Sequence, residues 1–129
     1  MTMAAGYAGL TKLFTPEAAG ALAERGEAMR ARLNALCAKE GVAMQFTGVG
    51  SLMNAHFLRG EVRRVDDLAV VDGRLRQLLF FHLLGQGIYA SPRGFVVLSL
   101  PLSDADIDRF VAAIGSFIGE YQTMLPSVK

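Results

Sequence analysis

The stretch GIYASPRGFVVLSLPLSDADID, residues 87–108, contains a turn, strand-forming residues and the start of a helix. Residues 88–90 and 95–100 are rich in β-branched, aromatic and other apolar side chains and predict two short strands. Proline and glycine predict a turn between them at residues 91–94. Pro101 ends the second strand, because proline has no amide hydrogen to donate to a sheet. The stretch predicts a corner that joins a strand to a helix.

The helix after this corner has a well-defined start. Ser103, followed three residues later by Asp106, resembles a capping box with the shorter acid in place of glutamate. The three aspartates at 104, 106 and 108 could also hold a metal, but carboxylates at a helix start satisfy free amides and complement the helix dipole, so we favour a cap. Apolar side chains then follow one helical face: Ile107, Phe110, Val111, Ile114, Phe117, Ile118 and Tyr121.

The residues before this stretch predict two more helices and a hairpin. Thr15-Pro16-Glu17 is a typical helix start, and apolar side chains at helical spacing continue from it to Gly41. Residues 42–46 and 51–58 predict two strands joined by a turn at 47–50. A further helix is predicted from a cap at Asp72 to about residue 84. The fold class is therefore α/β, or more narrowly α+β, with a small sheet of about four short, mainly antiparallel strands covered by helices.

The composition limits the possible functions. The 129 residues suffice for one domain, and the net charge of +1 gives no basis for binding nucleic acid or an anionic membrane. There is no apolar segment long enough to span a membrane and no secretory signal pattern at the start, so we expect a cytoplasmic protein. Cys37 is the single cysteine, which excludes an internal disulfide, and its place on a helical apolar stripe predicts a small buried side chain. The apolar share of 52% favours a partner that covers part of the surface.

Few side chains suggest chemistry. The glycine-rich residues 48–51 lack the spacing and the lysine of a phosphate-binding loop, which favours a hairpin turn. His56 and His82 lie in apolar segments with no metal-ligand spacing, which favours partly buried, hydrogen-bonded histidines. Ser91 and Arg93 lie on a turn where an arginine could bind a substrate carboxylate with two hydrogen bonds, although a solvated arginine is the simpler interpretation. Taken from its residues alone, the chain is a scaffold with no visible reaction centre.

Three segments together resemble one protein family. They are TMAAGYAGL at 2–10, AMQFTGVGSLMNAHF at 43–57, and the stretch at 87–108. In this order they resemble the C-terminal part of class III aminotransferases, which depend on pyridoxal phosphate, and specifically the branch that includes glutamate-1-semialdehyde aminomutase. The resemblance extends from residue 2 to about residue 120.

This resemblance implies a single C-terminal small domain at 1–129, with the fold of that domain in fold-type I pyridoxal-phosphate enzymes. Residues 1–14 would be the remnant of an interdomain helix, and residues 15–129 the domain core. The lysine that binds the cofactor and the acid that pairs with its pyridine nitrogen lie in a preceding large domain of the family. None of the lysines present matches the family's lysine motif: Lys12, Lys39 and Lys129.

It follows from the resemblance that pyridoxal phosphate belongs to the full-length parent and that this chain alone should bind none and be inactive. The implied partners are the missing cofactor domain and a second subunit in a homodimer. A rival hypothesis from another class is a non-enzymatic α/β module that dimerises or binds a partner through an apolar helical face.

The resemblance also implies a substrate-side wall formed by Ser91, Arg93 and Val96. The aminomutase typically has a proline, a serine, a variable residue, an aromatic residue and then a glutamate near its active site. The corresponding run here is Pro92 to Val96, so valine stands in place of the glutamate. This departure favours a related aminotransferase over the aminomutase, and Arg93 is the hypothetical contact for a substrate carboxylate.

Overall fold

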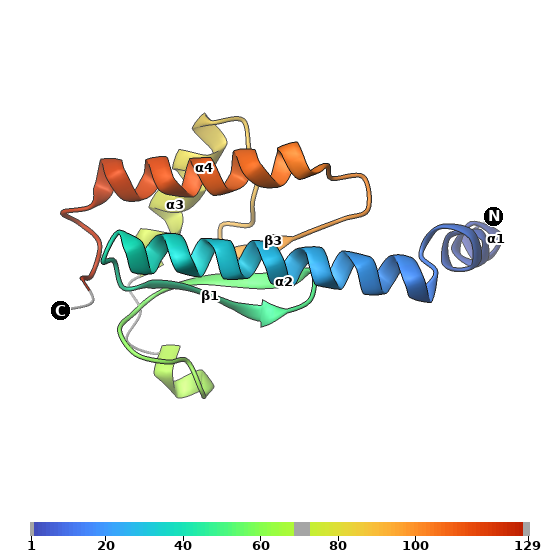
Figure 1. The fold of residues 1–129 in the computed structure, drawn as a ribbon, viewed down its shortest axis with the longest axis horizontal. Helices are drawn as coiled ribbons and strands as arrows, with labels where there is room; N and C mark the ends of the chain where they lie inside the picture. The colour runs from blue at the N-terminus through green and yellow to red at the C-terminus, as the bar shows by residue number, and fades with distance from the viewer. Residues whose placement is uncertain (1, 69–72, 128–129) are drawn as a thin grey trace.

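The computed structural model describes residues 2–68 and 73–127. Within these ranges the chain forms four α-helices, three strands and two short helical turns (Figure 1). In chain order they are α1 (Thr2–Ala8), a π-helical turn (Gly9–Leu13), α2 (Pro16–Lys39), β1 (Met44–Val49), β2 (Leu52–Phe57), a 3-10 turn (Val65–Leu68), α3 (Gly73–Gly85), β3 (Phe95–Val97) and α4 (Asp104–Tyr121). The predicted cap at Asp72 lies outside the described residues.

The sheet has the order β1-β2-β3, and both strand pairs are antiparallel. The predicted hairpin is confirmed, because β1 pairs with β2 from Met44↔Phe57 to Val49↔Leu52. The predicted class and strand direction are confirmed as well. The expected number of about four strands is too high, since the described residues form three.

The missing strand is the one predicted at residues 88–90. Its first amide, that of Ile88, donates to the Leu83 carbonyl at the end of α3, at 2.9 Å, so this segment begins as a helix cap and not as a strand. The second predicted strand is also shorter than expected and ends at Val97. The Leu98 amide still donates to the Ser51 carbonyl at 2.9 Å, but the chain then turns toward Pro101.

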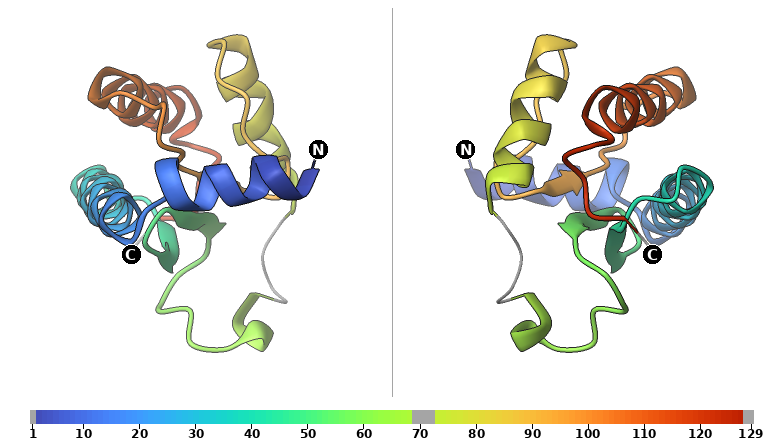
Figure 2. Two further views of the ribbon diagram at one scale, coloured as in Figure 1. Left: turned by 90° about the vertical axis from the view of Figure 1, so that its right-hand side faces the viewer. Right: turned by 90° about the vertical axis from the view of Figure 1, so that its left-hand side faces the viewer.

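The three long helices lie on one side of the sheet, and the segment around residues 59–68 lies on the other (Figure 2). Helix α2 packs on β1 and α4, while α3 packs on α4 and β2. The predicted apolar helix faces are confirmed, because α2, α3 and α4 all supply fully buried side chains to one core that the strands complete. The deepest side chains of this core are Leu33, Cys37, Phe46, Met53, Leu83, Ile114, Phe117 and Ile118.

The hairpin is fixed against α2 by a close backbone approach. Gly26 faces the turn so tightly that a Cβ built there would lie 2.1 Å from the Gly50 carbonyl oxygen. The Glu27 carboxylate accepts a hydrogen bond of 2.8 Å from the Gly50 amide. Two turns later along α2, Asn34 accepts from the Phe46 amide at 2.7 Å and donates to its carbonyl at 3.0 Å. These contacts set the register of the hairpin on the helix.

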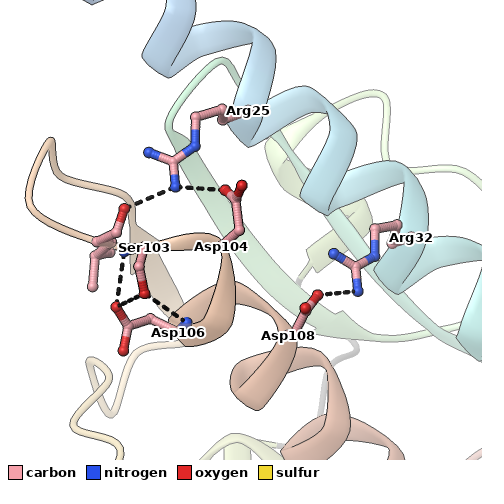
Figure 3. Close-up of polar contacts among 7 residues, drawn as sticks. Arg25, Arg32, Ser103, Asp104, Asp106 and Asp108 are labelled. Atoms are coloured by element: carbon pink, nitrogen blue, oxygen red, sulfur yellow. Dashed lines mark hydrogen bonds and ion pairs between the residues drawn. The ribbon is translucent and has the colours of Figure 1, made fainter.

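Helix α4 begins with the predicted capping box (Figure 3). The Ser103 hydroxyl accepts from the Asp106 amide at 3.2 Å, and the Asp106 carboxylate accepts from the Ser103 amide at 2.8 Å. This hydrogen bonding lowers the pKa of Asp106. The other two aspartates pair with α2, because Arg25 contacts Asp104 at 3.0 Å and Arg32 contacts Asp108 at 2.7 Å. The aspartates therefore join two helices.

The first helix lies at the far end of α2, away from the sheet (Figure 1). Neither α1 nor the π-helical turn contains a buried residue. Large apolar side chains are exposed along this segment: Met3, Tyr7, Leu10, Leu13 and Phe14. Among the described residues no helix is long and apolar enough to cross a membrane.

Candidate functional site

A cavity of about 510 Å³ opens between the segment after α3, strand β3 and the first turns of α4. Ser91 and Val96 both line it, so the structure brings two of the three predicted wall residues together. Arg93 is not among the lining residues. The other side chains at this cavity are mostly apolar and include Met29, Ile88, Ala90, Leu98, Leu102, Ile107 and Phe110.

Arg93 lies on an exposed turn whose backbone is well fixed. The Gly94 amide donates to the Ser91 carbonyl at 2.9 Å, which closes the turn. The Ser91 hydroxyl accepts from the Arg93 amide at 3.3 Å, so the serine supports the backbone of the arginine. Gly94 has a φ of 88°, a left-handed conformation that glycine adopts at low cost. The turn therefore presents an exposed guanidinium on a rigid base.

Val96 and Phe95 point to opposite faces of the sheet, as consecutive strand residues do. Val96 pairs with the buried Met53 and faces the helices, while Phe95 pairs with Asn54 on the other face. Because a valine side chain carries no ionisable group, this position cannot transfer a proton.

Both histidines are partly or fully buried and hydrogen-bonded, as predicted. The His56 side chain is only 4% exposed, and its Nε2 lies 2.9 Å from the Thr47 hydroxyl. Burial lowers the pKa of His56, and the nearby Arg76 guanidinium lowers it further. His82 Nδ1 lies 3.4 Å from the Glu120 carboxylate, and its ring contacts Phe117 and Tyr121.

The remaining candidates have structural roles. Cys37 is 1% exposed, which confirms the predicted buried side chain, and this burial raises the pKa of its thiol to about 11. The glycine-rich residues 48–51 lie in the hairpin, as predicted, but the turn is shorter than the predicted 47–50: β1 continues to Val49, and only Gly50 and Ser51 form the turn. Over residues 2–68 and 73–127 no group of three or more acidic, histidine or cysteine side chains could hold a metal ion.

Comparison with known proteins shows which proteins this chain is similar to. No family model matches the chain. Over 126 residues, 98% of the chain, it is 83% identical to the β-phenylalanine transaminase of Variovorax paradoxus, of which it covers 29%. The homologues of this chain are class III aminotransferases that use pyridoxal phosphate. The chain corresponds to a C-terminal part of these aminotransferases and spans less than a third of their length.

The aminotransferase fold is confirmed by solved structures. The crystal structure of the Variovorax paradoxus β-phenylalanine aminotransferase superposes with a TM-score of 0.97 at 81% identity, over 99% of this chain and 30% of that one. The aminomutase branch is more distant. The glutamate-1-semialdehyde aminomutase of Sorangium cellulosum is 32% identical over 115 residues, which are 88% of this chain and 26% of the aminomutase.

The two lysines among the described residues, Lys12 and Lys39, do not fit the covalent anchor that an aminotransferase needs for its cofactor. Lys12 is exposed on the π-helical turn, and Lys39 is exposed at the end of α2. Neither lines the cavity beside β3. A lysine that reacts with an aldehyde is usually desolvated in a pocket, which lowers its pKa. Neither described lysine has such surroundings.

Sequence reasoning missed a polar cluster beside the Arg93 turn, formed by Asn54, His56 and Arg76. Asn54 and His56 line a second cavity of about 640 Å³ on the sheet face away from the helices. One buried polar atom of each side chain has no hydrogen-bond partner in the described part of the chain: Asn54 Oδ1, His56 Nδ1 and Arg76 Nε. The available signal was the spacing of Asn54 and His56, since residues two apart in a strand share a face.

Proposed function

We propose that this chain is the C-terminal domain of a pyridoxal-phosphate-dependent transaminase that accepts an aromatic β-amino acid. The observation that carries the proposal is the match over nearly the whole chain to the β-phenylalanine transaminase, at 83% identity. In this proposal the residues 15–129 form the domain core, and residues 1–14 form the end of a helix that leads from the cofactor domain. The exposed apolar side chains of that helix support the second part.

The domain contributes one wall of the substrate site, the turn and strand at Ser91, Arg93 and Val96. Arg93 binds the carboxylate of the substrate, because a guanidinium can donate two parallel hydrogen bonds to a carboxylate. Its exposure and its fixed backbone support this role. Val96 gives the wall an apolar surface without proton transfer, which favours transamination over the aminomutase reaction.

The cofactor is bound by the rest of the enzyme, where it provides the electron sink for amino-group transfer. The chain alone binds no pyridoxal phosphate, a proposal supported by the exposure of Lys12 and Lys39. Purified chain is treated with pyridoxal phosphate and then with borohydride, which fixes the cofactor on any lysine that has bound it. No lysine of the chain should be labelled specifically, whereas the Variovorax enzyme, the positive control, should be. A lysine labelled specifically in the chain would contradict this proposal.

The assembly is a cytoplasmic homodimer of the complete enzyme, and the chain binds neither nucleic acid nor a membrane.

The rival function is that of a non-enzymatic module that binds a partner. It is supported by the same exposed apolar side chains of α1 and the π-helical turn. The two differ in what covers these side chains, namely the cofactor domain in the first case and an unrelated protein in the second.

A chimera tests the proposed function. This chain replaces the corresponding segment of the Variovorax transaminase, and kcat/KM is measured for β-phenylalanine with a 2-oxo acid as amino acceptor. We expect kcat/KM within about tenfold of the parent enzyme, because 83% identity leaves most contacts unchanged. The matched control carries the segment of the Sorangium aminomutase and should not turn over β-phenylalanine. A chimera with this chain that folds, binds the cofactor and shows no turnover would exclude the function.

A further inference from the structure

The turn that carries Arg93 is clamped between two elements. On one side the Ala55 amide of β2 donates to the Gly94 carbonyl at 3.0 Å. A Cβ built on Gly94 would lie 2.6 Å from Asn54 Oδ1 and 3.3 Å from Arg76 Cδ. The carboxamide from β2 and the arginine stem from α3 therefore both lie against Gly94, next to Arg93 in the chain.

The two clamping side chains each bury a polar atom beside the turn. Asn54 Oδ1 and Arg76 Nε are buried and have no hydrogen-bond partner among residues 2–68 and 73–127. A buried polar group without a partner costs stability, and replacing it with an apolar group of similar shape is often neutral or favourable. Core stability therefore does not account for the choice of these two residues.

His56 completes the set of groups beneath the turn. It lies two residues from Asn54 on the same face of β2, and the positive charge of Arg76 is close enough to lower the pKa of His56. With its proton on Nε2, His56 donates to the Thr47 hydroxyl and leaves Nδ1 as an acceptor. Beneath the turn there are then one buried donor, Arg76 Nε–H, and two buried acceptors, Asn54 Oδ1 and His56 Nδ1, each without a hydrogen-bond partner among the described residues.

We propose that Asn54 and Arg76 are positioning residues that fix the turn at residues 91–94 and thereby the reach of Arg93 toward the substrate carboxylate. The inference rests on the proposed role of Arg93 in the complete transaminase. Because Arg93 binds the substrate and takes no part in the chemical step, a displaced turn lowers the affinity for acids and leaves kcat almost unchanged. Neither side chain needs to touch the substrate.

A double-mutant cycle in the active chimera tests this inference. The variants are Asn54→Leu, Arg93→Ala and the two together. Asn54→Leu should raise KM for β-phenylalanine about tenfold and leave kcat within about twofold, because it weakens binding and not chemistry. In the Arg93→Ala background the same change should alter KM by less than about twofold, since its effect passes through Arg93.

A second variant and a control guard against a folding defect. Arg76→Met keeps an unbranched stem against Gly94 but removes the donor, and it should raise KM as Asn54→Leu does. Gln45→Leu changes another polar side chain on the same sheet face, one that donates to the Gly60 carbonyl at 2.6 Å and does not contact the turn. Its KM should equal that of the unchanged chimera. The cofactor absorbance and the Tm of each variant report its folding.

The outcomes separate the two claims. If Arg93→Ala raises KM but Asn54→Leu and Arg76→Met do not, the positioning role is wrong and the role of Arg93 stands. Equal effects of Asn54→Leu with and without Arg93 also overturn the positioning role. If Arg93→Ala leaves KM unchanged in an active chimera, the proposed contact with the carboxylate is wrong, and the positioning role falls with it.

Discussion

The two faces of the small sheet differ in a way that separates folding from function. Phe46 and Met53 face the helices and are 1% and 2% exposed, so they are explained by burial of apolar surface. Thr47, Asn54 and His56 lie on the opposite face, where two of the three side chains hold a buried polar atom without a partner in the described ranges. The side chains of the packed face are explained by the stability that their burial gives the domain. The polar side chains of the opposite face are not explained in this way.

The largest effect should come from neighbouring residues on opposite faces of β1. Phe46→Ala should lower the free energy of unfolding by about 3–5 kcal/mol, because it leaves a cavity in the core. Thr47→Ala, one residue later, should cost less, about 1–2 kcal/mol, since it removes one hydrogen bond and leaves the buried His56 Nε2 without this partner. Urea unfolding of both variants measures the difference. Equal losses would contradict the distinction between the faces.

A smaller effect tests how the hairpin is held on the packed side. Gly26→Ala should cost about 2–3 kcal/mol, because its Cβ would lie 2.1 Å from the Gly50 carbonyl oxygen and the backbone must move. Gly20→Ala on the same helix is the matched control. No atom lies within 4 Å of a Cβ at Gly20, so alanine there should stabilise the chain by about 0.5–1 kcal/mol. A stabilising Gly26→Ala in urea unfolding would contradict the close approach.

The start of α4 tests the contribution of polar contacts at the surface. Ser103→Ala removes the cap and should lower the free energy of unfolding by about 1 kcal/mol. Asp108→Asn breaks only the exposed contact with Arg32 and should change the free energy of unfolding by less than about 0.5 kcal/mol. A larger loss for Asp108→Asn than for Ser103→Ala, measured in the same denaturant series, would be inconsistent with a structural cap.

The smallest effect is a pH dependence from the polar face. Because the pKa of His56 is lowered in the folded chain from its ordinary 6.5, the unfolded chain binds a proton first as pH falls. Stability should therefore decrease between pH 7.5 and 5.5, a range above the ordinary pKa values of the carboxyl groups. His56→Asn should reduce this slope in urea titrations. An unchanged slope would mean that another group titrates.

The sequence was sufficient to predict local structure but not the places where segments meet. Caps and apolar periodicity depend on residues a few positions apart, which is why the helix starts at Pro16 and Asp104 were predicted correctly. The extra strand at 88–90 was wrong, since its apolar residues fit a strand but its first amide completes the end of α3. The cluster of Asn54 and Arg76 could not be predicted, because it depends on α3 reaching Gly94 beside β2.

The central claim is that the turn on this domain contacts a substrate carboxylate, and one measurement tests it most directly. In the active chimera, Arg93→Ala is assayed with β-phenylalanine and with an aromatic amine that lacks the carboxylate. We predict that KM for the acid rises about tenfold or more, while KM for the amine stays within about twofold, because only the acid loses a charged hydrogen bond. Unchanged selectivity between the acid and the amine would contradict the claim.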